Sequence, residues 1–305
     1  MNYDITIIIP CFNEEDNVER LIAEITRYVQ TMDPVKCEVI FIDDGSTDGT
    51  FQKIKQASHK FYAARIIRFS RNFGSHAALF AGIRASRGLY TTYLAADLQY
   101  PLEIVGQLYR KCLEGFDLVR LERDSVGDPF LKRVFSKGYA ALMRSYVCAD
   151  YPVNGFDIVM FHRKVRQELE DHAESNSSIL LRMISLGFKQ TAIPGRKLER
   201  QAGQSKWTWR KNIKLMIDSF VSFSYAPVRG ISLIGFVFFA AGVLYFIQIL
   251  CVAGISVERM ILAVLLTGLG VTNMALGIIG EYLWRTFEAV RPNKIYVIDN
   301  IVDLN

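Results

Sequence analysis

Two long apolar runs without ionisable residues constrain this chain more than any other feature. Residues 230–257 contain no Asp, Glu, Lys or Arg, and after Glu258 and Arg259 the same holds for residues 260–280. A helix needs about 20 residues to cross a hydrocarbon core about 30 Å thick. The alternative, a pair of buried helices in a large globular core, is disfavoured because no charge interrupts either run. The sequence therefore predicts two transmembrane helices after a long soluble region.

Basic residues flank the pair of apolar runs on the outside. Those before the first run are Arg210, Lys211, Lys214 and Arg229, and those after the second are Arg285, Arg291 and Lys294. Between the runs, Arg259 is balanced by Glu258. By the positive-inside rule both flanks are expected to be cytoplasmic. The chain starts Met-Asn-Tyr-Asp and enters an apolar strand pattern without a basic-then-apolar leader, so no cleaved signal is expected.

Composition narrows the class of protein. Half of the 305 residues are hydrophobic, and the five cysteines lack the paired spacing of zinc sites or disulfide frameworks, which fits reduced thiols in the cytosol. The net charge of +5 suits an anionic membrane surface or phosphate ligands. Nucleic acid is not expected as a partner, because no patch of interleaved basic and aromatic residues occurs.

A repeated order of strand, polar loop and helix fills the first third of the chain. The apolar segments 4–10, 38–42, 64–69 and 89–94 are predicted strands, and the first helix is expected over about 17–30. This alternation predicts an α/β domain with a mostly parallel sheet, whose ligand crevice lies at the carboxyl ends of the strands. Gly-x-Gly-x-x-Gly and P-loop motifs are absent from the sequence, which disfavours a dinucleotide dehydrogenase or a P-loop ATPase.

Polar side chains follow two of these strands. Asp97 and Gln99 come shortly after the segment 89–94, where a hard divalent cation and its phosphates would bind. Asp44 follows the segment 38–42, where it could accept hydrogen bonds from a base or a ribose. For both positions an ordinary polar turn remains the alternative interpretation.

Several motifs occur in one order along the chain. Residues 9–15 read Ile-Pro-Cys-Phe-Asn-Glu-Glu, residues 42–50 Ile-Asp-Asp-Gly-Ser-Thr-Asp-Gly-Thr, residues 70–74 Ser-Arg-Asn-Phe-Gly and residues 96–101 Ala-Asp-Leu-Gln-Tyr-Pro. Together they resemble the inverting family 2 glycosyltransferases, which implies a GT-A fold that binds a nucleotide sugar.

Later motifs narrow the resemblance. They are Arg123, Lys132-Arg133 with Ser136, Gly155-Phe156-Asp157, the segment 200–207 and the segment 277–283. These stretches resemble the polyprenyl-phosphate glycosyltransferases, a group that includes dolichyl-phosphate mannose synthase and the bactoprenol glucosyltransferases. The resemblance covers nearly the whole chain.

The resemblance implies a set of site residues. The nucleotide would be held by Pro10, Phe12, Glu14, Ile42, Asp44, Arg71, Ala96 and Asp97. Asp97 and Gln99 would be ligands to Mg²⁺ or Mn²⁺. The catalytic set would be Asp97, Arg123, Arg200 and Lys206, and the acceptor phosphate would contact Arg123, Arg133 and Ser136.

Elementary chemistry agrees with this set. A nucleotide diphosphate leaving group needs its growing charge neutralised, which a divalent cation and guanidinium groups do. A lipid phosphate monoester is largely ionised at neutral pH because its second pKa is about 6. The acceptor therefore needs positioning behind the anomeric carbon more than it needs a strong general base.

Ala95 departs from the family pattern, which has an Asp at this position. On an extended strand Ala95 and Asp97 would point to the same side, so the chain would lack one of two neighbouring carboxylates. Magnesium often takes only one or two protein carboxylates plus phosphates and water, so a weaker metal site is expected. The alternative is a non-catalytic, membrane-tethered protein that binds a nucleotide sugar or a lipid phosphate.

The predicted layout has four parts. They are a cytoplasmic GT-A catalytic domain (1–206), an interfacial amphipathic region (207–228) whose second half could instead pack on that domain, a two-helix transmembrane domain (229–284) and a cytoplasmic tail (285–305). A processive polysaccharide synthase is disfavoured because the chain lacks a Gln-x-x-Arg-Trp element.

The function expected from the resemblance is transfer of one sugar to undecaprenyl phosphate at the cytoplasmic face of the inner membrane. The product would serve cell-surface glycan synthesis or O-antigen modification. The resemblance to the family 2 glycosyltransferases favours a UDP-sugar as donor. The spacing of residues identifies neither the sugar nor the base, and a homo-oligomer stays open.

Overall fold

The computed structural model describes most of the chain. The described residues are 3–123, 138, 140–141, 144–145, 151–152, 155–170, 179–195, 226–251, 256–290 and 295–304. They form two compact units, the first made of Met1–Met216 with Lys294–Asn305 and the second of Ile217–Asn293.

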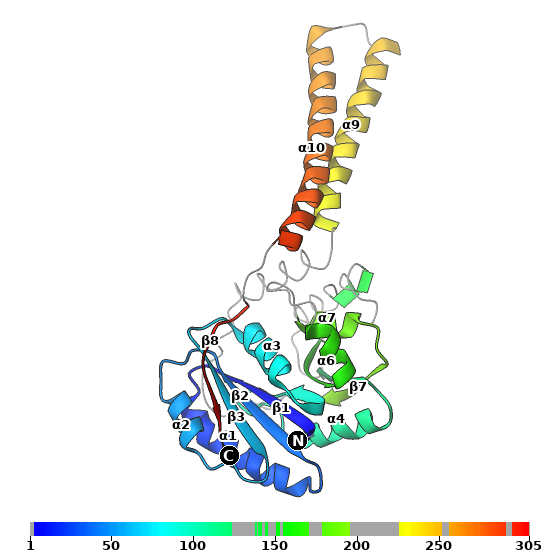
Figure 1. Cartoon of the computed structure of the whole chain (residues 1–305). Coiled ribbons are helices and arrows are strands. Elements are labelled where there is room, and N and C mark those ends of the chain that lie inside the picture. Colours follow the sequence, from blue (N-terminus) through cyan, green and yellow to red (C-terminus); the bar gives the residue numbers. More distant parts are fainter. Residues whose placement is uncertain are drawn as a thin grey trace. The chain divides into compact units, whose positions relative to one another are not determined.

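A single mixed sheet organises the first unit (Figure 1). Its strand order is β7-β5-β6-β4-β1-β2-β3-β8. The bounds are β1 Tyr3–Cys11, β2 Cys37–Asp43, β3 Ala63–Phe69, β4 Gly88–Tyr93, β5 Leu118–Arg123, β6 Phe156–His162, β7 Gln190–Gly195 and β8 Ile298–Asp303. Strands β1 to β4 run parallel to one another, whereas β6 and β8 are antiparallel to their neighbours. The predicted α/β, mostly parallel sheet is confirmed, and the carboxyl ends of β1 to β4 share one edge.

Helices cover both faces of the sheet. Those of the first unit are α1 Glu15–Thr31, α2 Thr50–Gln56, α3 Ser75–Ala85, α4 Glu103–Leu113, α6 Arg163–Glu170 and α7 Ile179–Ser185. Strand residues alternate between faces, so Ile5, Ile7 and Ile9 join the core that α1 fills. On the other face α3 lies so close that a Cβ added at Gly82 would come 2.3 Å from Ile8 Cγ2. Full burial of such side chains stabilises the fold by about 1.5–3 kcal/mol each.

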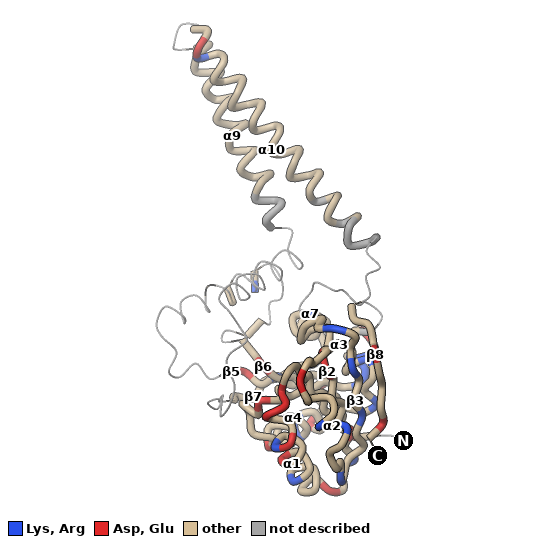
Figure 2. The backbone as a smooth tube through the Cα atoms, turned by 90° about the vertical axis from the view of Figure 1, so that its left-hand side faces the viewer, with Lys and Arg blue, Asp and Glu red and all other residues tan. Residues whose placement is uncertain are grey.

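The second unit is a pair of long apolar helices, α9 Ala226–Cys251 and α10 Val257–Val290. Within them two segments are long and apolar enough to cross a membrane, Ile231–Cys251 and Val257–Trp284. In the most hydrophobic 18-residue stretch of each segment, only 17% is buried. Leu233 and Leu244 are 64% and 66% exposed. Figure 2 shows few charges along this pair. Apolar side chains that face outward on a helix pair suit a lipid environment.

Small residues bring α9 and α10 together. A Cβ added at Gly270 would lie 2.4 Å from the backbone nitrogen of Phe239, so the two backbones nearly touch. The connection between the helices lies earlier than predicted, because α9 ends at Cys251 and α10 begins at Val257, which takes Glu258 into its first turn. A carboxylate there interacts favourably with the positive end of the helix dipole.

The C-terminal segment corrects the predicted layout. Residues 285–305 were predicted to form a cytoplasmic tail with a strand-like stretch at 294–299, without a partner. In the structure β8 pairs antiparallel with β3, and Leu304 N donates to Ala64 O at 2.9 Å. Only Val302 of this strand packs against the core, while Ile298 and Ile301 are exposed. Such a one-sided edge strand carries too weak a hydrophobic pattern to be placed from sequence. The interfacial region predicted at 207–228 lies outside the described residues, apart from the start of α9.

Candidate active site

The loops that follow β1 and β2 are joined by their own polar groups. Asp44 N donates to Cys11 O at 2.9 Å, and Asn13 N donates to Ser46 Oγ at 3.0 Å. In return, Thr47 N donates to Asn13 Oδ1 at 2.9 Å. These bonds join residues more than 30 positions apart, so the two motifs found in the sequence form one surface at the sheet edge.

A second group of bonds joins the starts of α1 and α2. Glu14 N donates to Thr50 Oγ1 at 2.8 Å, and Gly49 N donates to Glu15 Oε2 at 3.0 Å. Asp48 Oδ1 accepts from Thr50 N at 3.0 Å. Backbone amides at the start of a helix have no partner within the helix. Here they are satisfied by the first side chain of the facing helix and by Asp48.

Asp44 is the central brace of this edge. Its side chain is buried, at 4% exposure, and accepts hydrogen bonds from the backbone N–H groups of Phe73 at 2.7 Å and Gly74 at 2.9 Å. Burial raises the pKa of the Asp44 carboxyl, and the two amides partly offset that shift. The loop after β3 is therefore fixed to the end of β2. Each carboxylate oxygen keeps a further lone pair, so Asp44 can still accept from a ligand.

Gly45 permits the close contact behind this brace. Its φ is +67°, and an added Cβ would lie 2.4 Å from the carbonyl carbon of Arg71. Asp43, one residue earlier, is fully buried beside Arg68, with 3.4 Å between Asp43 Oδ2 and Arg68 Nε. Burial raises the pKa of the Asp43 carboxyl. The sequence assigned no role to Asp43, although a second carboxylate at a strand end was a signal for one.

The other predicted nucleotide residues differ in exposure. Pro10, Phe12 and Glu14 are half-buried at the end of β1. Arg71 is exposed, and its guanidinium lies 4.1 Å from the ring centroid of Phe73. The side chain of Ile42 is fully buried, so any contact of this residue with a nucleotide would come from its backbone.

The loop after β4 turns sharply at the predicted metal ligands. Strand β4 ends at Tyr93, and Leu98 N donates to Ala95 O at 3.3 Å. Leu98 adopts a φ of +49°, and Gln99 N donates to Asp97 Oδ1 at 3.4 Å. Ala95 is exposed and Ala96 is buried, while Asp97 and Gln99 are half-buried. The expectation that Ala95 and Asp97 share one side of an extended strand is wrong, because these residues lie in a turn.

A divalent cation fits this loop only with help from a ligand. Among the described residues no three His, Cys, Asp or Glu side chains gather as a metal site. Asp97 would supply one carboxylate and Gln99 one amide oxygen, and magnesium accepts so few protein ligands when phosphate oxygens and water complete its shell. The residues present therefore fit a cation that binds together with a diphosphate.

Asp157 fixes the loop after β4 to β6. Tyr100 Oη donates to Asp157 Oδ2 at 2.6 Å, and the hydroxyl of Tyr93 donates to the Asp157 carbonyl. Asp157 was noticed in the sequence only as part of a motif, without a role. Its contacts make it a support for the loop that carries Asp97.

The cationic site residues lie at or beyond the limits of the description. The backbone of Arg123 ends β5, opposite Gly195 of β7, but its side chain is not described. Arg133, Ser136, Arg200 and Lys206 lie outside the described residues. Their grouping around phosphates remains a prediction.

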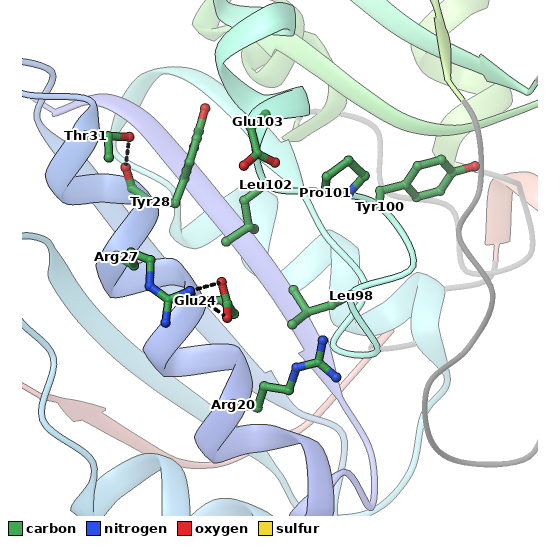
Figure 3. A pocket seen from close by; sticks show the side chains of 10 residues that line it. All are labelled: Arg20, Glu24, Arg27, Tyr28, Thr31, Leu98, Tyr100, Pro101, Leu102 and Glu103. Atoms are coloured by element: carbon green, nitrogen blue, oxygen red, sulfur yellow. Dashed lines mark hydrogen bonds and ion pairs between the residues drawn. The ribbon is translucent and has the colours of Figure 1, made fainter.

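A cavity of about 350 Å³ lies between α1 and the segment 98–103 (Figure 3). It is lined by Arg20, Glu24, Arg27, Tyr28 and Thr31 of α1 and by Leu98, Tyr100, Pro101, Leu102 and Glu103. It contains no predicted site residue, although two of its lining residues flank Gln99.

A mostly parallel sheet whose polar loops converge at one edge, with the carboxylate of Asp97 after β4, is the architecture expected of a GT-A nucleotide-sugar transferase. Residues 6–175 match the family model described as Glycosyl transferase family 2. The chain belongs to this family and is a glycosyltransferase.

Similar proteins extend the match beyond the family domain. The chain is 32% identical over 301 residues to the Bacillus subtilis protein named glycosyltransferase CsbB, covering 96% of this chain and 91% of that one. It is 28% identical over 306 residues to undecaprenyl-phosphate 4-deoxy-4-formamido-L-arabinose transferase of Salmonella choleraesuis, covering 98% and 93%.

A solved structure supports the fold. Mannosyl-3-phosphoglycerate synthase from Rubrobacter xylanophilus superposes with a TM-score of 0.50 at 16% identity, covering 71% of each chain. At this identity the likeness concerns the fold alone.

Proposed function

We propose that this chain transfers one sugar from a nucleotide diphosphate donor, with a UDP-sugar favoured, to undecaprenyl phosphate at the cytoplasmic face of the membrane. One observation carries the proposal. The same chain has a sheet edge whose loops are hydrogen-bonded to Asp44, as suits a nucleotide site, and a pair of apolar helices long enough to cross a membrane. A water-soluble donor and a lipid acceptor require these two surfaces. The name of the Salmonella relative supports the class of acceptor.

The path of the chain supports one orientation. The first unit contains both Met1–Met216 and Lys294–Asn305, and β8 pairs with β3 inside its sheet. The chain therefore leaves this unit before the two candidate spans and returns to it after them. Two crossings satisfy that path, and the basic flanks of the spans favour the cytoplasmic side for both connections.

The chain's own residues would divide the chemistry as follows. Asp44 and its braced loops would hold the nucleoside, and Asp97 with Gln99 would hold Mg²⁺ or Mn²⁺ against the diphosphate. That cation neutralises charge on the leaving group when bound. Arg123, Arg200 and Lys206 would bind phosphates, and Arg133 with Ser136 would orient the acceptor. Because a phosphate monoester is largely ionised near neutral pH, orientation matters more than proton removal.

The experiment that tests this function uses the full-length protein in detergent, undecaprenyl phosphate and a panel of radiolabelled UDP- and GDP-sugars with Mg²⁺. Label in butanol-extractable lipid carrying one sugar supports the proposal. Label in a polymer indicates a processive synthase, and donor binding without transfer indicates a tethered binder. A matched reaction with chelator tests the need for the cation.

A further inference from the structure

We propose that Tyr296, which follows the second candidate span, is a positioning residue for the loop at residues 70–74. The inference rests on the proposed function in one respect, namely that this loop contributes to the donor site. The C-terminal segment would thereby support a loop that lies more than 200 residues away in the sequence.

Strand β8 runs beside β3 (Figure 1), and backbone pairing at its start brings Tyr296 near the end of β3. Strand β8 pairs with β3 up to the register Phe69–Ile298. Just beyond this pair, Ser70 N donates to Val297 O at 3.0 Å. The first residue of the loop is thus bonded to the residue that follows Tyr296.

Aromatic rings continue this contact into the loop. The ring of Tyr296 stacks on that of Phe69, with centroids 5.0 Å apart and an interplanar angle of 10°. Phe69 meets Phe73 edge to face at 5.8 Å. On the ring of Phe73 lies the guanidinium of Arg71 at 4.1 Å. The ring of Tyr296 also lies near that of Phe80 of α3, with centroids 6.5 Å apart. Tyr296 therefore contacts both β3 and α3, which the loop connects.

The same loop meets the donor edge through its backbone. Phe73 N and Gly74 N both donate to the buried carboxylate of Asp44. The loop is therefore held from two sides, by Val297 and Tyr296 at its start and by Asp44 at its end. Removal of the Tyr296 ring leaves Phe69 and Phe73 without their outer support, which loosens the geometry of Arg71 and of the two amides on Asp44.

The alternative is that β8 only completes the sheet and stabilises the first unit as a whole. Asp303, at the opposite end of the same strand, separates these two roles. Its carboxylate is 70% exposed and pairs with Arg65, with 2.6 Å between Asp303 Oδ1 and Arg65 Nε. Asp303→Ala weakens the attachment of β8 without touching the aromatic stack, and it is therefore the matched control.

The test compares full-length wild type, Tyr296→Ala, Tyr296→Phe and Asp303→Ala by hydrogen exchange and by titration with UDP and Mg²⁺. We expect Tyr296→Ala to speed amide exchange in residues 70–74, and to weaken UDP binding, by roughly two- to tenfold. Tyr296→Phe keeps the stack and should resemble wild type, as should Asp303→Ala. If Tyr296→Ala does not fold, Tyr296→Leu keeps the apolar volume and takes its place.

Two results would overturn the inference. One is unchanged exchange at 70–74 in Tyr296→Ala, and the other is an equal rise in Asp303→Ala. If wild type fails to bind UDP, the proposed donor is wrong, yet exchange in residues 70–74 still decides the role of Tyr296.

Discussion

The two ends of the candidate donor site are built differently. After β1, β2 and β3, the loops are held by hydrogen bonds within the protein, with Asp44 bonded to Phe73 and Gly74 and Asn13 bonded to Thr47. After β4, the loop presents one half-buried carboxylate, Asp97, which accepts a long bond from Gln99 N. The end proposed to hold the nucleoside is thus preorganised, whereas the end proposed to hold the diphosphate would be completed by the donor and its cation.

The sharpest way to break this comparison is to remove the carboxylate at the incomplete end. Asp97→Asn should lower transfer by roughly 100- to 1000-fold, because it deletes the charge that places the cation beside the diphosphate. The melting temperature should hardly change, since Asp97 is only half-buried. Initial rates with saturating donor measure the effect, and Glu114→Gln, which changes an exposed carboxylate at the C-terminal end of α4, is the control. Near-normal turnover would show that the cation is held elsewhere.

Arg200 and Lys206 test the same end through its expected phosphate contacts. Arg200→Ala and Lys206→Ala should each cost about 1.5–3 kcal/mol in transition-state binding, the range for a hydrogen bond to a charged group. Separate titrations of donor and acceptor show which phosphate each residue contacts. Unchanged kinetics for both substrates would remove the residue from the site.

Asp44 tests the preorganised end. Asp44→Asn keeps one acceptor oxygen but turns an N–H group toward the amides of Phe73 and Gly74. The free energy of UDP binding should become about 1.5 kcal/mol less favourable, which raises the Kd for UDP roughly tenfold. Titration of both proteins with UDP measures the change. An equal affinity would show that the loop after β3 does not need this brace.

The stability of wild type relative to Asp44→Asn should fall as pH rises. Burial raises the pKa of the Asp44 carboxyl above its ordinary value of 3.8, so the folded protein holds that proton more tightly than the unfolded chain does. Its contribution to stability is present below the ordinary pKa and is lost as pH rises through the folded value. Thermal melts from pH 4 upward should therefore show wild type losing stability relative to Asp44→Asn. A constant difference would contradict this assignment.

The smallest effect is expected from Ala95→Asp, which tests whether the loop after β4 lacks a carboxylate. Ala95→Asp adds a carboxylate to the turn that contains Asp97, and Ala95 is exposed, so the new side chain has room. We expect the Mg²⁺ concentration for half-maximal rate to fall a few-fold, with no change in the lipid accepted. A uniform loss of rate at every Mg²⁺ concentration would mean that the donor pocket is built differently. Transfer by Ala95→Asp alone, with an inactive wild type, would favour the tethered binder.

Local patterns in the sequence determined the elements themselves. Apolar alternation and polar loop ends predicted β1 to β4 and α1 within a few residues, because strand and helix periodicity are properties of neighbouring side chains. The two uncharged runs predicted α9 and α10 for the same reason. The motifs at residues 42–50 and 96–101 also predicted which loops would carry the chemistry, and this assignment stays a prediction.

Only the tertiary structure decided how those loops are held. The bond from Phe73 N to Asp44 spans 29 positions, that from Tyr100 to Asp157 spans 57, and the pair Arg65–Asp303 spans 238. Such contacts arise when buried polar groups find partners across a packed sheet, and no local period encodes which partner is near. The pairing of β8 with β3 was not predicted for this reason, and neither was the place of Ala95 in a turn, whose loop is held by the bond from Tyr100 to the distant Asp157.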